Sequence, residues 1–111
     1  MSDFPKSTCL ACEGGVARLD PDSVRVLLAK LPGWALVAEG TAIERTFHFD
    51  NYWQTMAFVN SVAWVAHTED HHPDMSVHWG KCVVRYNTHA VGGLTDNDFI
   101  CAEKVSAIVS G

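Results

Sequence analysis

The stretch that decides the fold is residues 71–88, HHPDMSVHWGKCVVRYNT. Apolar residues at positions 75, 77 and 79 alternate with polar residues at 76 and 78, the period-2 pattern of a strand with one buried face. A second strand-like run, 82–88, follows the pair Gly80-Lys81, which suits a tight turn. The stretch therefore predicts an antiparallel hairpin with strands over 75–79 and 82–88.

An equivalent hairpin is predicted upstream, over residues 34–37 and 43–49. The two runs are separated by Glu39-Gly40. In the second run, Ile43, Phe47 and Phe49 share one face with Arg45, while polar residues occupy positions 44, 46 and 48. Short connections of this kind join antiparallel strands, so these runs predict a second hairpin.

Helix-start signals precede both hairpins. Asp20-Pro21 supplies a capping residue and a proline at the first helical position, and apolar residues at 24, 27, 28 and 31 then share one face. Asp50-Asn51 can cap a second helix that runs to about His67. The apolar residues of this second helix cover most of its circumference, so it needs burial on more than one side. We therefore expect a homo-oligomer, either a dimer or a tetramer, that associates through residues 51–67.

A third helix is predicted to start at Thr95, which is followed three residues later by Asp98. Apolar residues at 101, 105, 108 and 109 form its buried stripe. The resulting order is helix, hairpin, helix, hairpin, helix. We expect an α+β two-layer sandwich, in which three helices lie on one face of a four-stranded antiparallel sheet.

Length and charge limit the organisation and the partners of the chain. Its 111 residues accommodate one domain, expected over 18–111, after a tail at 1–17 that lacks periodicity. The net charge of -5 argues against nucleic acid and anionic membranes as partners, and without a signal-like start we expect a cytoplasmic protein. Cys9 and Cys12 have a CxxC spacing, but no second CxxC follows to complete a zinc site, and their role stays open.

Histidines are the candidate chemical groups. The chain has six, and five of them, His67, His71, His72, His78 and His89, fall within residues 67–89. His71 and His72 stand where Pro73 ends a helix, so that both rings could project into a cleft, and His89 lies in the loop after the last strand. His48 and His78 alternate with apolar strand residues, and we expect both on a solvated face of the sheet.

Several of these positions together resemble one known family. His71-His72-Pro73, Trp79, His89 and Asp98 match the pterin-4a-carbinolamine dehydratases in identity and spacing. The resemblance extends to the segments 9–13, 32–34 and 47–49, so that it spans nearly the whole chain. One position departs from the family: His67 stands where an acidic residue is common.

The resemblance implies an enzyme that removes water from a 4a-hydroxytetrahydropterin and thereby recycles the cofactor of aromatic amino-acid hydroxylases. Histidine suits the two proton transfers because it titrates near neutral pH, and no metal or cofactor is required. The implied catalytic residues are His71, His72, His89 and Asp98, with Asp98 orienting a histidine. The implied pterin-binding residues are His71, His72, Pro73, Trp79, Thr88, His89, Ala90 and Val91.

Other interpretations stay open at this point. Asp98 could simply be the carboxylate at a helix N-terminus, paired with Thr95, and Trp79 could belong to the core. His67 and His71 are four residues apart and could bind a metal ion, although the metalloprotease spacing is not met. A non-catalytic binding or dimerisation partner of the same fold is the alternative function.

Overall fold

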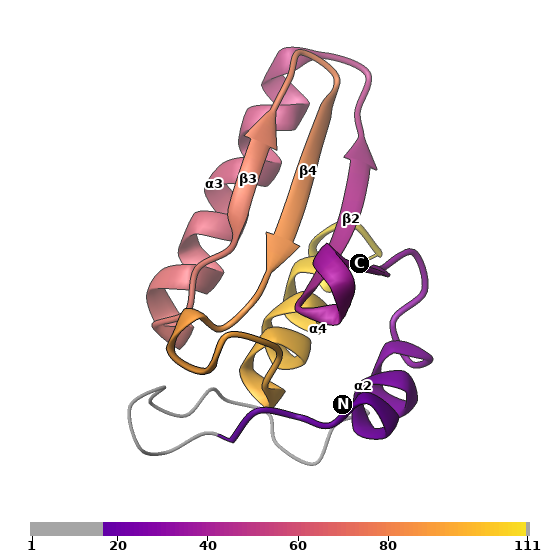
Figure 1. Ribbon diagram of the computed structural model, residues 1–111. Coiled ribbons are helices and arrows are strands. Elements are labelled where there is room, and N and C mark those ends of the chain that lie inside the picture. Colours follow the sequence, from indigo (N-terminus) through magenta and orange to yellow (C-terminus); the bar gives the residue numbers. More distant parts are fainter. Residues whose placement is uncertain (1–16, 111) are drawn as a thin grey trace.

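The computed structural model describes residues 17–110 (Figure 1). Its elements in chain order are α2 (Pro21–Leu28), β1 (Ala35–Val37), the 3-10 turn η1 (Ala38–Gly40), β2 (Ala42–His48), α3 (Tyr52–Glu69), β3 (Asp74–Val77), β4 (Lys81–Tyr86), the 3-10 turn η2 (His89–Val91) and α4 (Asp96–Ser110). The predicted order of helices and hairpins is confirmed. The predicted tail, apart from its last residue, and the Cys9–Cys12 pair lie outside the described residues.

The strands form one antiparallel sheet in the order β1-β2-β4-β3. The two longest strands, β2 and β4, are central and pair from Ile43 opposite Tyr86 to His48 opposite Lys81. β3 is an edge strand, and its first residue, Asp74, lies opposite Arg85 near the end of β4. This register brings the segment before β3 and the segment after β4 to the same end of the sheet.

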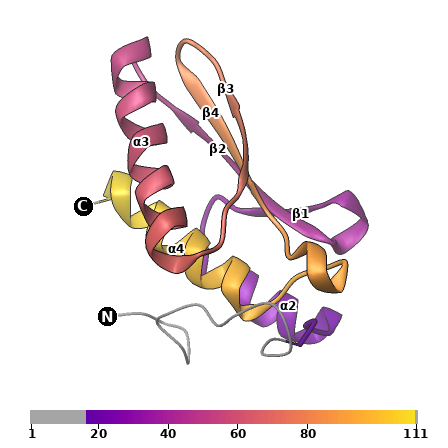
Figure 2. The same cartoon turned by 90° about the vertical axis from the view of Figure 1, so that its left-hand side faces the viewer.

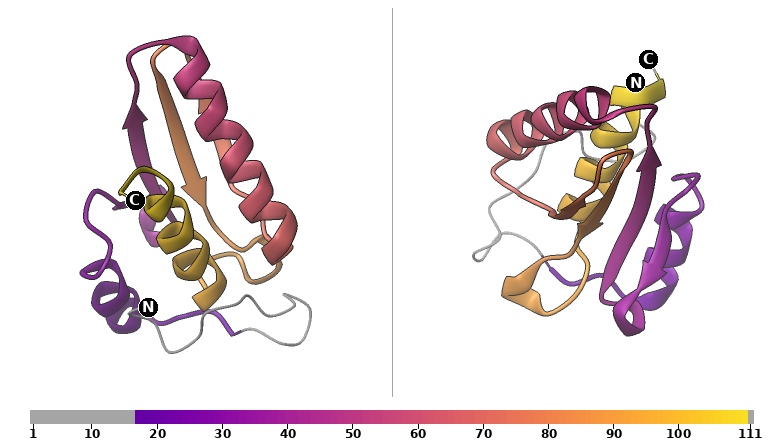
Figure 3. Two further views of the ribbon diagram at one scale, coloured as in Figure 1. Left: turned by 180° about the vertical axis from the view of Figure 1, so that it is seen from behind. Right: turned by 90° about the horizontal axis from the view of Figure 1, so that it is seen from above.

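Two helices cover one face of this sheet. Figures 2 and 3 show α3 and α4 side by side across it, with α2 at the end of the helical layer. α2 and the first residue of α4 line a common hollow, which places α2 next to the start of α4. The protein is thus an α+β two-layer sandwich, as the sequence predicts.

The core lies between the sheet and the helices. Phe47 of β2 contacts Phe58 of α3 with ring centroids 4.5 Å apart, and Trp34 meets Phe47 edge-on at 6.1 Å. α4 is buried over its first two turns, polar residues included: Asn97, Asp98, Phe99, Ile100, Cys101 and Ala102. The start of α4 is therefore inside the protein, where a carboxylate must find partners.

Capping residues set the starts of α2 and α3 where the sequence predicts them. The Asp20 carboxylate accepts a hydrogen bond from the Ser23 N–H at 2.8 Å, and this bond lowers the pKa of the exposed Asp20 carboxyl. The Asn51 side chain accepts from the Gln54 N–H at 2.9 Å. Both caps satisfy backbone donors that the first turn of a helix leaves unpaired.

The second hairpin differs from the prediction at its tip. β3 ends at Val77 rather than at residue 79, so Trp79 lies in the turn and not in a strand. The His78 N–H donates to the Lys81 carbonyl at 2.8 Å, and the Thr55 hydroxyl of α3 donates to the Trp79 carbonyl at 2.9 Å. These bonds close the turn around Trp79, whose side chain is 64% exposed and outside the core.

The outer face of α3 is not covered by other parts of residues 17–110. α3 buries Thr55, Phe58 and Val62, whereas Trp53 and Trp64 are 76% and 66% exposed. The predicted need for burial on a second side is therefore unmet within the described residues. No helix among residues 17–110 combines the length and hydropathy required to cross a bilayer.

Candidate active site

The end of α3 delivers two histidines to one end of the sheet. Asp70 caps the helix in the left-handed conformation, with φ 53° and ψ 41°, and its N–H bonds to the Ala66 carbonyl. Aspartate adopts this conformation more readily than most residues, because its short polar side chain tolerates it. The chain therefore turns sharply after the helix, and His71 and His72 follow before β3 begins at Asp74.

The two neighbouring histidines occupy different environments. His71 is buried, with its ring stacked on Tyr86 at 5.7 Å between centroids and at an angle of 14°. Its Nε2 lies 2.7 Å from Oδ1 of Asp98. His72 is exposed, and its Nδ1 lies 3.2 Å from the Pro73 carbonyl. Because a carbonyl only accepts, this contact is a hydrogen bond when Nδ1 of His72 carries the proton.

Asp98 is fully buried at the start of α4 and accepts from three elements at once. Besides the bond with His71, Asp98 accepts hydrogen bonds from the Thr88 hydroxyl at 2.8 Å and from the Thr95 N–H at 3.0 Å, both on Oδ2. The bond to Thr95 is half of a capping box, and the bond to His71 is a histidine–carboxylate pair. Both interpretations of Asp98 therefore describe real contacts, and the same carboxylate starts the helix and holds the imidazole.

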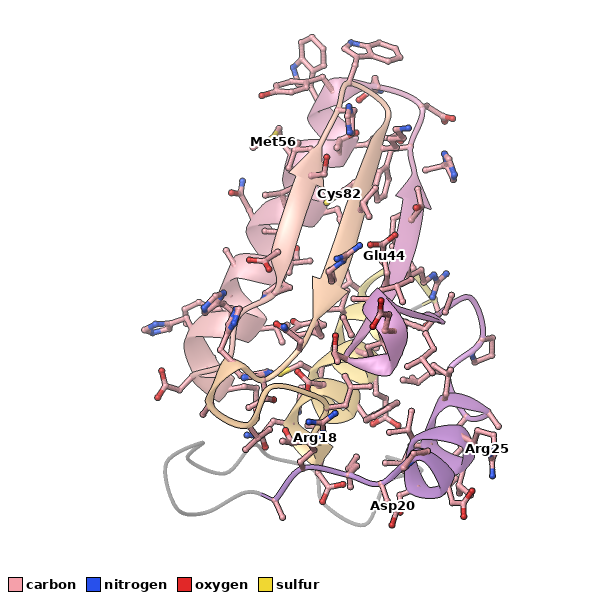
Figure 4. All side chains as sticks on the ribbon, in the orientation of Figure 1. Arg18, Asp20, Arg25, Glu44, Met56 and Cys82 are labelled. Atoms are coloured by element: carbon pink, nitrogen blue, oxygen red, sulfur yellow. The ribbon has the colours of Figure 1, made fainter. Side chains whose placement is uncertain are left out.

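A short closed loop presents the third histidine. The Thr88 N–H donates to the Gly93 carbonyl at 2.9 Å, and the intervening residues form η2, which ends at Gly92 with φ 64°. Arg18 packs against this loop: a Cβ at Gly93 would lie 2.6 Å from its Nε, and Figure 4 shows Arg18 beneath the loop. His89 lies at the start of η2 and is exposed.

These segments enclose a pocket of about 210 Å³. It is lined by the predicted residues His71, His72, Thr88, His89 and Ala90. Asp70 and Asn87 also line it, and no pattern in the sequence singles them out. Hollows of about 540 and 440 Å³ lie elsewhere in the described chain, and neither is lined by more than one histidine.

The remaining predicted site residues lie outside this pocket lining. Asp98 stands behind His71, and Pro73 is buried next to His72. Val91 closes η2. Trp79 is at the other end of the second hairpin, with the length of β3 between it and His72, so one chain does not bring it to the pocket.

His48 and His78, expected on a solvated face of the sheet, and His67, whose role the sequence leaves open, are not among the residues that line the pocket. His48 and His78 are exposed, and Nε2 of His78 lies 2.9 Å from the Ser76 hydroxyl. His67 is exposed on α3 with its ring 5.4 Å from that of Trp64. Of the cysteines in the described chain, Cys82 and Cys101 are buried, as expected, and burial raises the pKa of the Cys82 thiol.

Three histidines around one pocket, one of them held by a buried carboxylate, define a site suited to general acid–base chemistry. Comparison with known proteins identifies the family of this chain. The family described as "Pterin 4 alpha carbinolamine dehydratase" matches residues 17–108. The chain belongs to this family.

Related proteins match the sequence of this chain over most of their own length. A protein from Xanthomonas campestris pv. campestris (strain 8004) is 53% identical over 90% of this chain and 85% of its own. One from Nitrosomonas eutropha is 54% identical over 96% and 94%. Both are provisionally named pterin-4-alpha-carbinolamine dehydratases. The crystal structure of a "transcriptional coactivator/pterin dehydratase" from Brucella melitensis is 32% identical, with a TM-score of 0.80, and covers 83% of this chain and 98% of that one.

Proposed function

We propose that the protein is a dehydratase that converts 4a-hydroxytetrahydropterin to quinonoid dihydropterin and water. The observation that carries this proposal is the convergence of His71, His72 and His89 on one pocket, with Asp98 behind His71. Family membership indicates pterin dehydratase activity, and the pocket offers the groups that such a reaction needs.

The reaction requires two proton transfers. The C4a–O bond breaks and the hydroxyl leaves as water after receiving a proton, while the N5 proton is removed and a C=N bond forms between N5 and C4a. One group donates a proton and another accepts one, so no net proton is consumed. Imidazole does either near neutral pH, and a positioned acid or base typically contributes about 10²–10⁴-fold in rate.

The environments of the histidines suggest different parts in this chemistry. His72 and His89 are exposed at the pocket and can exchange protons with water between turnovers. His71 is buried and fixed, so it is suited to binding or polarising the substrate from one defined direction. We expect backbone groups of 88–91 that are not used in the loop's own hydrogen bonds to bond the amide edge of the pterin.

The size of the pocket fits part of the substrate. At about 210 Å³ it is smaller than the roughly 300–1,000 Å³ of typical ligand pockets. We expect it to hold the bicyclic pterin ring and to leave the side chain at C6 in solvent. Such a site would be tolerant of different pterin side chains, which is consistent with a role in recycling the cofactor of an aromatic amino-acid hydroxylase.

The proposal also concerns the oligomeric state of the enzyme. The exposed tryptophans of α3, Trp53 and Trp64, support self-association into a dimer or tetramer through this helix.

The two proton transfers need no metal ion or cofactor. Dialysis against a strong chelator is therefore expected to leave the rate unchanged, and activity that returns only with added zinc would contradict this.

The direct test is a turnover assay. Carbinolamine generated by a phenylalanine hydroxylase is mixed with the purified protein, and the loss of its absorbance is compared with the uncatalysed rate. Acceleration that scales with protein concentration is expected. A rate equal to the background would contradict the proposal and favour the alternative, a non-catalytic binding or dimerisation partner of the same fold.

A further inference from the structure

A chain of buried hydroxyl groups stands behind the histidine–carboxylate pair. Thr88 Oγ1 lies 2.8 Å from Asp98 Oδ2 and 2.9 Å from Thr95 Oγ1. Thr88, Thr95 and Asp98 are 1%, 0% and 0% exposed, so water does not compete for these bonds. The three residues come from the end of β4 and from the start of α4, and the chain they form ends at His71.

The protons available on these groups determine which one donates and which one accepts in each hydrogen bond. An ionised carboxylate only accepts hydrogen bonds, so Thr88 donates its single hydroxyl proton to Asp98. The 2.9 Å contact between the two threonine hydroxyls must then be made with the proton of Thr95. For the same reason Nε2 of His71 carries a proton and donates it to Oδ1. The direction runs from Thr95 to Thr88 to Asp98, and His71 meets the carboxylate from the other side.

The helix does not account for the position of the Thr95 hydroxyl. An ordinary threonine N-cap uses its side-chain oxygen to accept from a backbone N–H of its own helix. Within residues 17–110, the hydroxyl of Thr95 bonds instead to Thr88 across the site. The helix start uses the other half of the capping box, the Thr95 N–H on Asp98. The hydroxyl is thus placed for the network around Asp98.

We propose that Thr88 and Thr95 are positioning residues that act on His71 through Asp98. The Thr88 hydroxyl and the Thr95 N–H both donate to Oδ2 of Asp98, and these two bonds fix the rotation of the carboxylate. Oδ1 is then the acceptor that faces His71 and holds its proton on Nε2. The inference rests on the dehydratase activity proposed above only for its effect on rate.

The first test reads the imidazole directly and needs no substrate. In ¹⁵N-labelled protein the ring nitrogens of His71 are expected to show the Nε2–H form. In Asp98→Asn the two donors hold the amide oxygen at the Oδ2 position, so the amide NH₂ faces His71 and the proton moves to Nδ1. A wild-type ring that carries a proton on Nδ1 and none on Nε2, or an Asp98→Asn ring that keeps its proton on Nε2, would overturn the proposal.

The second test separates positioning from packing. Thr88→Val keeps the shape and removes the hydroxyl, and Thr88→Ser restores the hydroxyl. Loss of one hydrogen bond to the carboxylate is expected to lower kcat about tenfold in Thr88→Val, with KM within about twofold because the backbone that faces the pterin is unchanged. Thr88→Ser is expected to recover most of kcat. Thr95→Val should shift kcat in the same direction by less, since it acts one bond further away.

A double-mutant cycle completes the experiment. If Thr88 acts through the carboxylate, Thr88→Val causes no further loss of kcat in the Asp98→Asn background. A full tenfold loss in that background, or an unchanged kcat in Thr88→Val, would overturn the proposal. Thermal melts of all variants identify any loss that reflects unfolding. Wild-type protein without dehydratase activity would contradict the proposed function, while the ¹⁵N measurement would still decide the positioning role.

Discussion

Removal of the Asp98 carboxylate should destabilise the whole protein. In Asp98→Ala, three buried donors lose their acceptor: Nε2 of His71 at 2.7 Å, the Thr88 hydroxyl at 2.8 Å and the Thr95 N–H at 3.0 Å. Each unpaired donor costs about 1–3 kcal/mol, and partial relaxation reduces the sum. We expect a loss of about 3–5 kcal/mol, the range seen when one partner of a buried pair is removed.

This loss is large for a domain of this size. Total stabilities are about 5–15 kcal/mol, and 1 kcal/mol shifts Tm by about 4–8 °C for 60–100 residues. Scanning calorimetry and urea titration should therefore place Tm of Asp98→Ala at least about 12 °C below wild type. Asp50→Ala, which removes an exposed carboxylate, is the control and should change stability by about 0.5 kcal/mol or less. A Tm decrease for Asp98→Ala no larger than that of the control would refute the reasoning.

Three further predictions concern parts of the protein outside the pocket. Asn51→Ala removes the cap on Gln54 and should cost about 1 kcal/mol in urea titration; no measurable change would show that the cap is dispensable. Cys82 is buried with a raised thiol pKa, so labelling followed by peptide mass analysis should modify it only as fast as the protein unfolds, and rapid labelling of folded protein would count against the core. Light scattering at micromolar concentration should show a dimer or tetramer that Trp64→Glu weakens, and a monodisperse wild-type monomer would exclude self-association through α3.

Local sequence signals were sufficient for most of the fold. The caps at Asp20 and Asn51 and the period-2 alternation around Phe47 act within a few residues, and each produces the predicted element. The tip of the second hairpin was mispredicted because alternation continues through Trp79 although the strand does not. After Val77 the chain turns through Trp79 and Gly80, where the His78 N–H bonds to the Lys81 carbonyl and the Thr55 hydroxyl of α3 bonds to the Trp79 carbonyl across 24 positions of sequence.

The sequence indicates which histidines line the pocket, but it does not indicate their burial or their hydrogen-bond partners. The clustering of five histidines over residues 67–89 and the family resemblance together indicate His71, His72 and His89, and these three line one pocket. Burial of His71 and exposure of His72 could not be read from two identical neighbouring residues, because the difference arises where α3 ends against α4. The hydroxyl chain from Thr95 through Thr88 also depends on tertiary packing, which brings the end of β4 against the start of α4.

The central claim is that the histidine pocket performs the dehydration, and one comparison of four variants tests it most directly. His72→Ala and His89→Ala remove groups that line the pocket, whereas His48→Ala and His78→Ala remove exposed histidines outside it. All four should have similar melting temperatures, since exposed substitutions usually change stability by about 0.5 kcal/mol or less. Assayed for carbinolamine dehydration at one pH, the two pocket variants should lose about 10²-fold or more and approach the uncatalysed rate. The two controls should keep nearly full activity. Pocket variants as active as the controls would contradict the account.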